Sequence, residues 1–470
     1  METFDLLVVG GGINGAAVAR DAAGRGRSVL LVERDDLAAH TSSASSKLVH
    51  GGLRYLEQLD FALVRESLRE REILLRTAPH IVRPLRFILP DPPGGRPTWL
   101  LRAGLWLYDA LAGRSSLPRS RRADPSFAAP LKPGFRLLEY WDAWVDDSRL
   151  VVLNALDAAE RGAEIATRTE LASARRDGDH WRAELSGGRM VAARAIVNAA
   201  GAWVCEVMKS RLGVESRSKV RLVKGSHIAV PRLWSGDHGW ILQQPDRRVV
   251  FALPYGLDLC LLGTTEVPVG GPEEAKVTAD EIDYLCAAAN ACFRRGVGLQ
   301  DVVWSYSGVR SLWDDGSARA QDVTRDYRLE LDPAPGPKLL SVFGGKLTTA
   351  RALAEEALNR LGWAGGGWTA ASPLPGGDSP EGEAPGWLPE PMRRRLAGAY
   401  GSRLDRVLVG AKSLEGLGRD FGGGLYETEV RYLVDTELAR TADDILWRRT
   451  KLGLVLSPDE QQALREHMGA

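Results

Sequence analysis

The fold of this chain is decided by the stretch Phe4-Asp5-Leu6-Leu7-Val8-Val9-Gly10-Gly11-Gly12-Ile13-Asn14-Gly15. Its apolar first half predicts a short β-strand, and the alanine-rich continuation from Ile13 to Gly24 predicts a helix. A second apolar run from Ser28 to Val32 predicts another strand, which ends on Glu33. The order of strand, GxGxxG turn, helix, strand and acid is typical of a βαβ unit that binds a dinucleotide.

Each part of this unit has a physical role toward a dinucleotide. Gly10 makes the tight turn, Gly12 lets the backbone approach a pyrophosphate, and Gly15 lets the helix pack on the strands. The helix N-terminus offers free N–H groups and partial positive charge to the anion. Glu33 can accept from ribose hydroxyls, which disfavours NADP. NAD and FAD both satisfy the pattern, and a glycine-rich loop in another α/β protein is the alternative.

The same strand–glycine–helix pattern occurs twice more. Residues 195–198 predict a strand that runs into Ala200-Gly201, and residues 339–343 predict one that runs into Gly344-Gly345-Lys346. A helix is expected from Ala350 to Leu361. Because open α/β sheets bind ligands at the carboxyl ends of their strands, we expect one sheet to collect all three turns at one edge.

Composition limits the remaining classes of function. The chain has 470 residues, enough for two or three domains, and 61 basic residues balance 61 acidic ones, so nothing favours nucleic acid as a partner. No signal peptide or bilayer-spanning apolar run is recognisable, which predicts a reduced, cytoplasmic setting. We expect buried thiols and no metal site, because no zinc or iron–sulfur spacing relates Cys205, Cys260, Cys286 and Cys292.

The middle of the chain predicts two helices and a second sheet. Residues Phe61 to Thr77 read as a charged helix, and Trp99 to Leu111 as an apolar, aromatic one. The second is too short to span a bilayer, and a core position is favoured over contact with lipid. A mostly antiparallel sheet is expected from the strands Val220–Val230, Trp240–Gln243, Val249–Pro254, Cys260–Thr264, Val302–Tyr306 and Tyr327–Leu331.

Residues 364–391 are rich in glycine, proline, alanine and serine, which predicts a linker. The chain beyond it, residues 392–470, is predicted to form a helical domain. One helix is expected from Glu427 to Leu438, and Thr441 and Asp444 resemble a capping box that opens the helix containing Trp447.

The polar stretch from Thr41 to Tyr55 contains the segment SSKLVHGGLRY. Its hydroxyls and backbone donors suit a phosphate or a ribityl chain, and a solvated loop is the equally weighted alternative.

These motifs together resemble the FAD-dependent glycerol-3-phosphate dehydrogenases of the aerobic, respiratory type, within the larger flavoprotein family that includes D-amino-acid oxidase. The resemblance covers nearly the whole chain. It rests on the glycine fingerprint and on SSKLVHGGLRYLE, EYWDAWVDDSRLV, KGSHI, LGTTE, YSGVRSL, TRDY, FGGKLTT and TADDILWRRTKLG. One departure is Ser311, which follows Arg310 where relatives often have proline.

The resemblance implies an α/β fold with a Rossmann-like FAD-binding domain from about 1–80, 150–215 and 336–363. A substrate domain with an antiparallel sheet would come from about 81–149 and 216–335, so that the flavoprotein region spans 1–363. FAD would contact Gly10, Gly12, Gly15, Glu33, Ser42, Ser46, Lys47, Leu48, Gly201, Gly344, Gly345 and Thr348.

The implied reaction is oxidation of sn-glycerol 3-phosphate to dihydroxyacetone phosphate by hydride transfer to FAD. Substrate would contact Arg54, Tyr55, Thr264 or Thr265, Arg310, Arg325 and Lys346. Arg310 and Lys346 would also act in catalysis, with His227 as the first choice for proton acceptor because its ordinary pKa is near neutral. A neutral histidine satisfied by the sheet is equally weighted, and His50 is the competitor. Without the resemblance, surface ion pairs would be preferred for Arg54 and Arg325, and a solvated side chain for Lys346.

The electron acceptor is inferred from two absences in the sequence. There is no obvious internal insertion of the kind found in relatives that use oxygen, and no cysteines near the C-terminus like those of the anaerobic subunits. Both point to a quinone, and therefore to peripheral attachment at the cytoplasmic face of a membrane. Alternatives are a flavin enzyme acting on an amine or a 2-hydroxy acid, an oxygen-using glycerol-3-phosphate oxidase, or a non-enzymatic dinucleotide-binding protein. Whether the chain forms a homodimer is left open.

Overall fold

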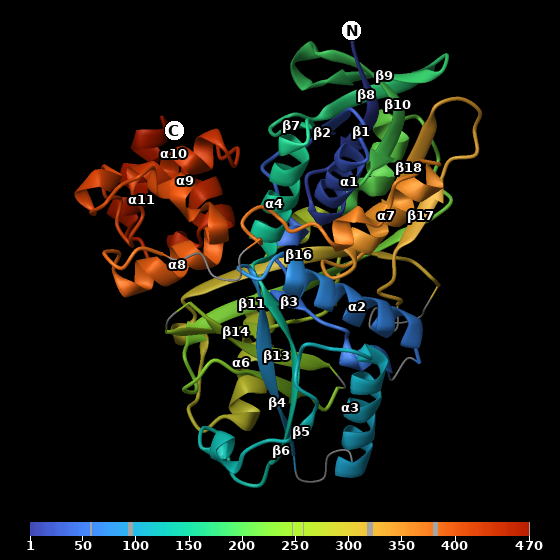
Figure 1. The fold of residues 1–470 in the computed structure, drawn as a ribbon. Coiled ribbons are helices and arrows are strands. Elements are labelled where there is room, and N and C mark those ends of the chain that lie inside the picture. Colours follow the sequence, from blue (N-terminus) through green and yellow to red (C-terminus); the bar gives the residue numbers. More distant parts are fainter. Residues whose placement is uncertain are drawn as a thin grey trace.

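The computed structural model describes residues 1–56, 59–92, 97–246, 248–256, 258–316, 323–378 and 384–469, without the side chain of Arg54. Its elements form two sheets with covering helices and a separate cluster of C-terminal helices (Figure 1). The predicted α/β class with an antiparallel second sheet and a C-terminal helical domain is confirmed.

The first sheet contains the three predicted glycine turns. Its strand order is β17 (Arg328–Leu331), β18 (Lys338–Phe343), β10 (Met190–Asn198), β1 (Glu2–Val9), β2 (Val29–Val32) and β7 (Glu164–Ala166), with β8 (Leu171–Asp177) and β9 (His180–Leu185) as a hairpin beside β10. Strands β1, β10 and β18 are adjacent and parallel, so the turns that follow them meet at one edge, as predicted.

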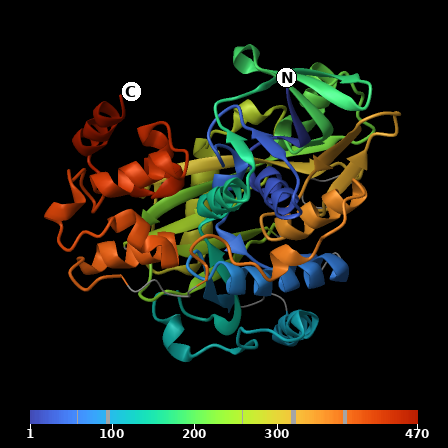
Figure 2. The same ribbon diagram turned by 45° about the horizontal axis from the view of Figure 1, so that its top comes forward.

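Helices cover this sheet and shape that edge. Helix α1 (Ile13–Gly24) has the predicted bounds, and it packs between α4 (Asp147–Glu160) and α7 (Ala350–Arg360), as Figure 2 shows from above. Short α5 (Val204–Glu206) follows the turn after β10. The core between them consists of small and branched side chains that are almost fully buried, among them Leu6, Val8, Ala16, Val151 and Leu353.

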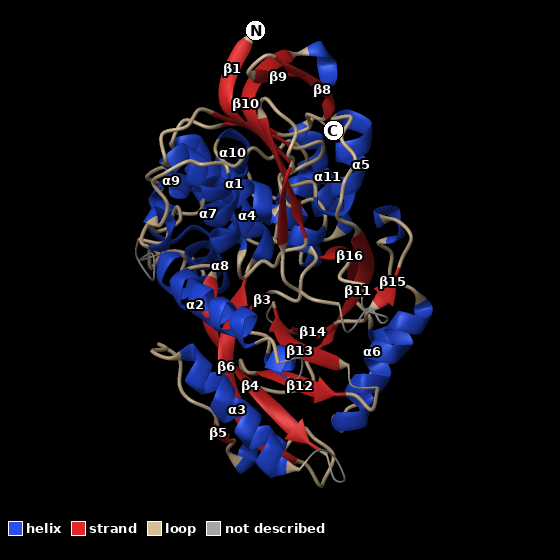
Figure 3. Ribbon diagram, turned by 90° about the vertical axis from the view of Figure 1, so that its right-hand side faces the viewer, coloured by secondary structure: helices blue, strands red, loops and turns tan. Residues whose placement is uncertain are grey.

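The second sheet lies beside the first (Figure 3). Its order is β15 (Val267–Pro268), β11 (Val220–Pro231), β14 (Leu259–Gly263), β13 (Val249–Tyr255), β12 (Gly239–Gln243), β4 (Val82–Asp91), β6 (Arg136–Val145) and β3 (Leu48–Val49), with β16 (Trp304–Trp313) beside β11 and β5 (Arg121–Arg122) beside β6. Among the described strands of this second sheet, only β12 and β4 pair in parallel. Nearby helices are α2 (Phe61–Thr77), α3 (Thr98–Ala112) and α6 (Ala279–Cys292).

Two strands, β16 and β17, differ from the predicted ones in length or in the sheet to which they belong. The strand predicted at Val302–Tyr306 does not end at Tyr306, because β16 pairs with β11 along its whole length, which places Arg310 within the strand. Gly308 serves a close approach, because a Cβ there would lie 2.9 Å from the Cβ of Ala44. The strand predicted at Tyr327–Leu331 belongs to the first sheet, where β17 pairs with β18.

The C-terminal helices have a core of their own, built by α8 (Glu390–Tyr400), α9 (Leu404–Leu408), α10 (Glu427–Asp435) and α11 (Pro458–Met468). The predicted helix from Glu427 ends three residues early, and Leu438 then has a φ of 61°. The capping box is confirmed, since Thr441 N donates to Asp444 Oδ2 at 3.0 Å and Asp444 N donates to Thr441 Oγ1 at 3.3 Å. The four cysteines are free thiols, three of them buried.

The segment before this cluster packs on the first sheet's helices. Trp368 Nε1 donates to Asp21 Oδ1 of α1 at 2.7 Å, and Leu374 lies in the core under α1. A Cβ at Gly24 would overlap the Trp368 ring at 2.0 Å, so glycine at the end of α1 makes room for this side chain.

Candidate functional site

A cavity of about 1140 Å³, here called the main cavity, lies between the two sheets. It begins at Glu33 after β2, passes the three glycine turns, and reaches the inner side of α3. Most predicted site residues line it: Gly10, Gly12, Glu33, Ser42, Ser46, Leu48, Tyr55, Gly201, Thr264, Arg310, Arg325, Gly344, Gly345, Lys346 and Thr348.

The glycines of the first turn are required by close backbone contacts. Gly10 has a φ of 110°, and a Cβ there would lie 2.6 Å from the carbonyl oxygen of Ala199. A Cβ at Gly15 would lie 1.9 Å from the carbonyl oxygen of Gly10, so Gly15 acts in packing and does not line the cavity. Gly12 faces the cavity, and the next residue, Ile13, donates its N–H to Ser42 Oγ at 3.0 Å.

Glu33 is fixed at the cavity edge by the backbone around it. Its Oε2 accepts from Gly11 N at 2.6 Å, and its Oε1 accepts from Asp35 N at 2.8 Å. Burial raises the pKa of Glu33 above its ordinary value, and these two hydrogen bonds act in the opposite direction. The side chain is therefore held in one orientation, with its carboxylate at the end of the cavity where α1 begins.

The segment 41–48, here called the serine loop, forms one wall of the cavity. Lys47 was predicted to contact FAD, but its side chain does not line the main cavity. Its Nζ lies 2.7 and 2.8 Å from the carboxylate oxygens of Asp147 and 2.9 Å from the carbonyl oxygen of Ser43. Ser45 Oγ also donates to Asp147, at 2.7 Å. Lys47 therefore holds the serine loop to the start of α4, and its neighbours face the cavity.

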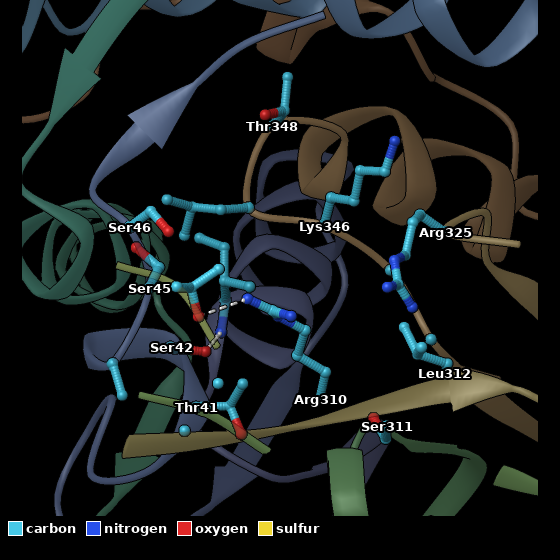
Figure 4. Close-up of a pocket in the computed structure, with 18 of the residues that line it drawn as sticks. Thr41, Ser42, Ser45, Ser46, Arg310, Ser311, Leu312, Arg325, Lys346 and Thr348 are labelled. Atoms are coloured by element: carbon cyan, nitrogen blue, oxygen red, sulfur yellow. Dashed lines mark hydrogen bonds between the residues drawn. The ribbon is translucent and has the colours of Figure 1, made fainter. Parts of the chain in front are cut away.

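Three cations, here called the basic cluster, face the cavity from the opposite side. Figure 4 shows Arg325 and Lys346 across from the serine loop, with the Arg310 guanidinium between them. Arg310 Nη2 donates to Thr264 Oγ1 at 3.1 Å, and Arg325 Nη2 donates to Glu266 Oε1 at 2.9 Å. Lys346 Nζ lies 4.0 Å above the Tyr55 ring.

Two nitrogen donors of the basic cluster have no hydrogen-bond partner in the described part of the chain. Arg325 Nη1 and Lys346 Nζ are buried and form no hydrogen bond within the described part of the chain. Burial lowers the pKa of Lys346, and the nearby Tyr55 and Asp326 offset this effect only in part. Buried donors without partners are costly, so this arrangement suits an anionic ligand that supplies several acceptors. The side chain of Arg54 lies outside the described part and stays a prediction.

The position of His227 argues against its predicted role as the proton acceptor. The residue is 2% exposed and does not line the main cavity. Its Nε2 lies 2.9 Å from Ser46 Oγ, and its ring stacks on Tyr306 with centroids 4.8 Å apart. Burial, then Arg310 and Lys47, hold its pKa well below the ordinary value. His227 is therefore an enclosed, neutral histidine, held by Ser46 of the serine loop, and its buried Nδ1 has no hydrogen-bond partner in the described part of the chain.

His50 lines the cavity and is the imidazole beside the basic cluster. Its backbone N–H donates to Thr348 Oγ1 at 3.4 Å, and its ring meets Phe251 edge to face, with centroids 6.1 Å apart. Burial, together with the charges of Lys346, Arg71 and Arg310, lowers its pKa to about 4. His50 is thus neutral near pH 7 and able to accept a proton.

Three residues of the site were not predicted from the sequence: Glu266, Asn14 and Gly225. Glu266 orients Arg325, and its signal was its place directly after the threonines of LGTTE. Asn14 Nδ2 donates to the carbonyl oxygen of Gly344 at 3.2 Å, which joins the first and third glycine turns. A Cβ at Gly225 would lie 2.8 Å from Arg310 Nη2, so this glycine makes room for the guanidinium. Of the two candidate threonines, Thr264 lines the cavity and Thr265 donates to Glu281 at 2.6 Å.

The chain is similar in sequence and in fold to known FAD-dependent proteins. Residues 5–360 match the family model described as FAD dependent oxidoreductase, and residues 367–468 match the C-terminal domain of alpha-glycerophosphate oxidase. The D-erythritol 1-phosphate dehydrogenase of Brucella abortus is 50% identical over 99% of this chain and 97% of that protein. The aerobic glycerol-3-phosphate dehydrogenase of Escherichia coli is 47% identical over 99% and 97%.

Among solved structures, the glycerol-3-phosphate dehydrogenase from Bacillus halodurans complexed with FAD has a TM-score of 0.70 and 26% identity. The match covers 99% of this chain and 94% of that chain.

Proposed function

The chain belongs to the family of FAD dependent oxidoreductases, and we propose that it oxidises sn-glycerol 3-phosphate to dihydroxyacetone phosphate. The observation that carries this proposal is the basic cluster, where three cations and two unpartnered donor groups face one end of the cofactor cavity. A phosphate dianion supplies the acceptors that these donors lack. A substrate with a single carboxylate, such as an amino acid or a 2-hydroxy acid, would leave more of this charge unbalanced.

The residues present fit FAD. Close backbone contacts at Gly10 and Gly15 leave a turn without side chains at the start of α1, where a pyrophosphate can reach the helix N-terminus. Glu33 would accept from the ribose, and Ser42, Gly201, Gly344, Gly345 and Thr348 would contact the middle and the flavin end. FAD, when bound, supplies the two-electron redox chemistry and accepts the hydride.

The basic cluster would hold the phosphate and orient the C2 hydroxyl. Arg310 can present two parallel N–H groups to phosphate oxygens while Thr264 fixes its position. Arg325 is held by Glu266 through one nitrogen and keeps the other for the ligand. Lys346, over the Tyr55 ring, adds a third positive charge.

His50 would accept the proton of the C2 hydroxyl. It is neutral because burial and nearby cations lower its pKa to about 4. A bound phosphate dianion offsets those cations, which raises the proton affinity of the imidazole when substrate is present. The protein would thereby remove a proton from oxygen while hydride leaves the adjacent carbon.

A longer polyol phosphate is the second candidate substrate. One relative, 50% identical, is named D-erythritol 1-phosphate dehydrogenase. The main cavity, at about 1140 Å³, must also hold FAD, so its volume alone does not distinguish a three-carbon from a four-carbon substrate. Both candidates share a phosphate and a secondary alcohol, and relative kcat/KM values decide between them.

For the electron acceptor we propose a membrane quinone, reached by peripheral contact at the cytoplasmic face. No helix in the described ranges is long and apolar enough to cross a bilayer. Helix α3, predicted as a core helix, instead exposes Trp99 and Trp106 by 71% and 69%. Exposed arginines follow it at 114, 119, 121 and 122, and this mixture suits an anionic lipid surface.

Two experiments test these proposals. Anaerobic addition of glycerol 3-phosphate should bleach the bound flavin, while glycine and lactate should not. In flotation with anionic vesicles, the protein should rise with the lipid and a Trp99→Ser, Trp106→Ser variant should stay behind. Equal flotation of both proteins would remove α3 as the contact surface.

A further inference from the structure

Glu281 is a buried carboxylate that lies outside the main cavity and connects three elements near the basic cluster. It stands in the first turn of α6. Its Oε1 accepts from the Oγ1 of Thr265, which follows β14, at 2.6 Å, and from the Oγ of Ser226, in β11, at 2.7 Å. Lys224 Nζ, also in β11, lies 2.9 Å from Oε2. The hydrogen bonds of Glu281 to Thr265 and Ser226 are here called the Glu281 anchor.

Thr265 lies between the two residues that orient the arginines of the basic cluster. On one side, Thr264 Oγ1 accepts from Arg310 Nη2 at 3.1 Å, and on the other, Glu266 Oε1 accepts from Arg325 Nη2 at 2.9 Å. Both orienting residues line the main cavity, whereas Thr265 is buried and does not. Because the three residues are consecutive, the position of Thr265 limits where the side chains on either side of it can point.

The backbone extends the same anchor to the strand that carries Arg310. Ser226 N donates to Thr265 Oγ1 at 2.9 Å, and Thr265 N donates to the carbonyl oxygen of Ser226 at 3.3 Å. Ser226 Oγ also lies 2.6 Å from Ser307 Oγ of β16, three residues before Arg310. One carboxylate therefore fixes the chain on both sides of the Arg310 guanidinium.

We propose that Glu281 is a positioning residue for phosphate binding by Arg310 and Arg325. The inference rests on the proposed function, in which the basic cluster binds the phosphate of the substrate. A carboxylate accepts hydrogen bonds more strongly than a neutral group does, so the Glu281 anchor holds Thr265 in one orientation. Residues 264–266 then keep both guanidinium groups facing the cavity, in the fixed geometry that an anion with several acceptors requires.

Glu281 has a second role, which the test must separate from the first. Its Oε2 accepts from Thr278 N at 3.0 Å and from Thr278 Oγ1 at 3.1 Å, as part of the capping box at the start of α6. A substitution of Glu281 therefore also weakens the helix. Thr278→Ala removes the hydroxyl of the cap and leaves the Glu281 anchor in place, so it is the matched control for the stability of α6.

Two variants interrupt the Glu281 anchor from its opposite ends. Glu281→Gln keeps the size of the side chain but removes its charge and one acceptor oxygen. Thr265→Val keeps the shape of the threonine and removes its hydroxyl, while Thr265→Ser retains the hydroxyl and is the conservative control. Should Glu281→Gln fail to fold, the comparison of Thr265→Val with Thr265→Ser decides alone.

Two measurements on the FAD-loaded proteins test the proposal. The rate of anaerobic flavin bleaching is followed against the concentration of glycerol 3-phosphate. Binding of inorganic phosphate to the oxidised proteins is measured by equilibrium dialysis, which does not depend on the alcohol or on electron transfer.

In Glu281→Gln and Thr265→Val, the half-saturating concentration of glycerol 3-phosphate and the Kd of phosphate should both rise about tenfold, within the roughly 10²-fold that a misplacement of ~1 Å can cost. The limiting rate of bleaching should stay close to that of the parent, because the phosphate is not a reacting group. Thr265→Ser and Thr278→Ala should keep the parent values of both quantities, and Thr278→Ala should also have a lower Tm.

Parent values of both quantities in Glu281→Gln and Thr265→Val would overturn the proposal and leave Glu281 as a helix cap. A loss in Thr278→Ala as large as that in Glu281→Gln would also overturn it, because the stability of α6 would then explain both. If glycerol 3-phosphate does not bleach the parent but phosphate binding weakens in the two anchor variants, the proposed substrate is wrong and the positioning role of Glu281 stands.

Discussion

Arg449 and Asp36 are 413 positions apart in the chain, yet their side chains form a buried, two-pronged ion pair with N–O distances of 2.8 and 2.9 Å. Asp36 also accepts from Arg448 Nε at 2.5 Å. Asp36 follows Glu33 by three residues, and its neighbours Arg34 and Ala38 line the same end of the main cavity. The C-terminal helices are thereby tied to the backbone that positions Glu33.

Breaking this ion pair should destabilise the fold and weaken the binding of FAD. Removing one partner of a buried ion pair typically costs about 3–5 kcal/mol. Arg449→Met is therefore expected to lower the Tm and to speed FAD release, measured by dilution and flavin fluorescence. The control is Arg431→Met, which removes an exposed pair with Glu427 and should change little. If Arg449→Met lowers the Tm but leaves the rate of FAD release unchanged, the ion pair stabilises the fold and does not affect cofactor binding.

Arg310→Ala should weaken use of glycerol 3-phosphate while leaving FAD content unchanged. A charged hydrogen bond contributes roughly 1.5–3 kcal/mol, or about ten- to a hundred-fold in kcat/KM at ~1.4 kcal/mol per decade. Arg310→Lys should recover only part of the loss, because an ammonium cannot form the two-pronged contact. Glycerol, which lacks the phosphate, should be a poor substrate that the mutation hardly affects. Loss of FAD from Arg310→Ala would assign the residue to the cofactor instead.

Substitution of His50 should lower kcat much more than substitution of His227. His50→Gln is expected to lower kcat by roughly 10²–10⁴, the usual range for a general base, with FAD retained. His227→Gln should keep most of kcat, because the ring lies behind Ser46 outside the cavity. Single-turnover flavin reduction at saturating substrate makes the comparison. A larger loss of kcat in His227→Gln than in His50→Gln would reverse the assignment.

Acid should destabilise the protein through its buried histidines. Burial lowers the pKa of His50 and His238 to about 4 and of His80 to about 3. Between pH 6.5 and about 4 the unfolded chain therefore binds more protons than the folded one, so stability falls as the pH falls. Each buried histidine contributes up to about 1.4 kcal/mol per pH unit in this window. His80→Phe, remote from the cavity, should make the dependence of Tm on pH shallower; an unchanged slope would contradict this.

Local chemistry made the first glycine unit predictable. The bounds of α1 and α2 agree with the sequence, because the glycine turn, the alanine run and the charged periodic stretch each favour one backbone conformation. The parallel arrangement of three strand–glycine–helix units followed from the same rule applied three times.

Features that depend on neighbouring strands were not predictable. The predicted strand ended at Tyr306, whereas β16 continues through Gly308, which admits Ala44 of the serine loop against the strand. His227 and His50 both stand in motifs of the same family, and only the packing of β11 between β14 and β16 shows which one is enclosed. Lys47 was assigned to the cofactor by position, whereas its partner Asp147 is a hundred residues away.

In the proposed function, the basic cluster presents a phosphorylated alcohol to FAD. The most direct measurement is the anaerobic absorbance of the bound flavin on mixing with glycerol 3-phosphate, in the parent and in Arg310→Ala. Rapid bleaching is expected in the parent, and the substrate concentration that gives half the maximal rate should be at least tenfold higher in the variant. No bleaching in the parent, or the same concentration dependence in both proteins, would contradict it.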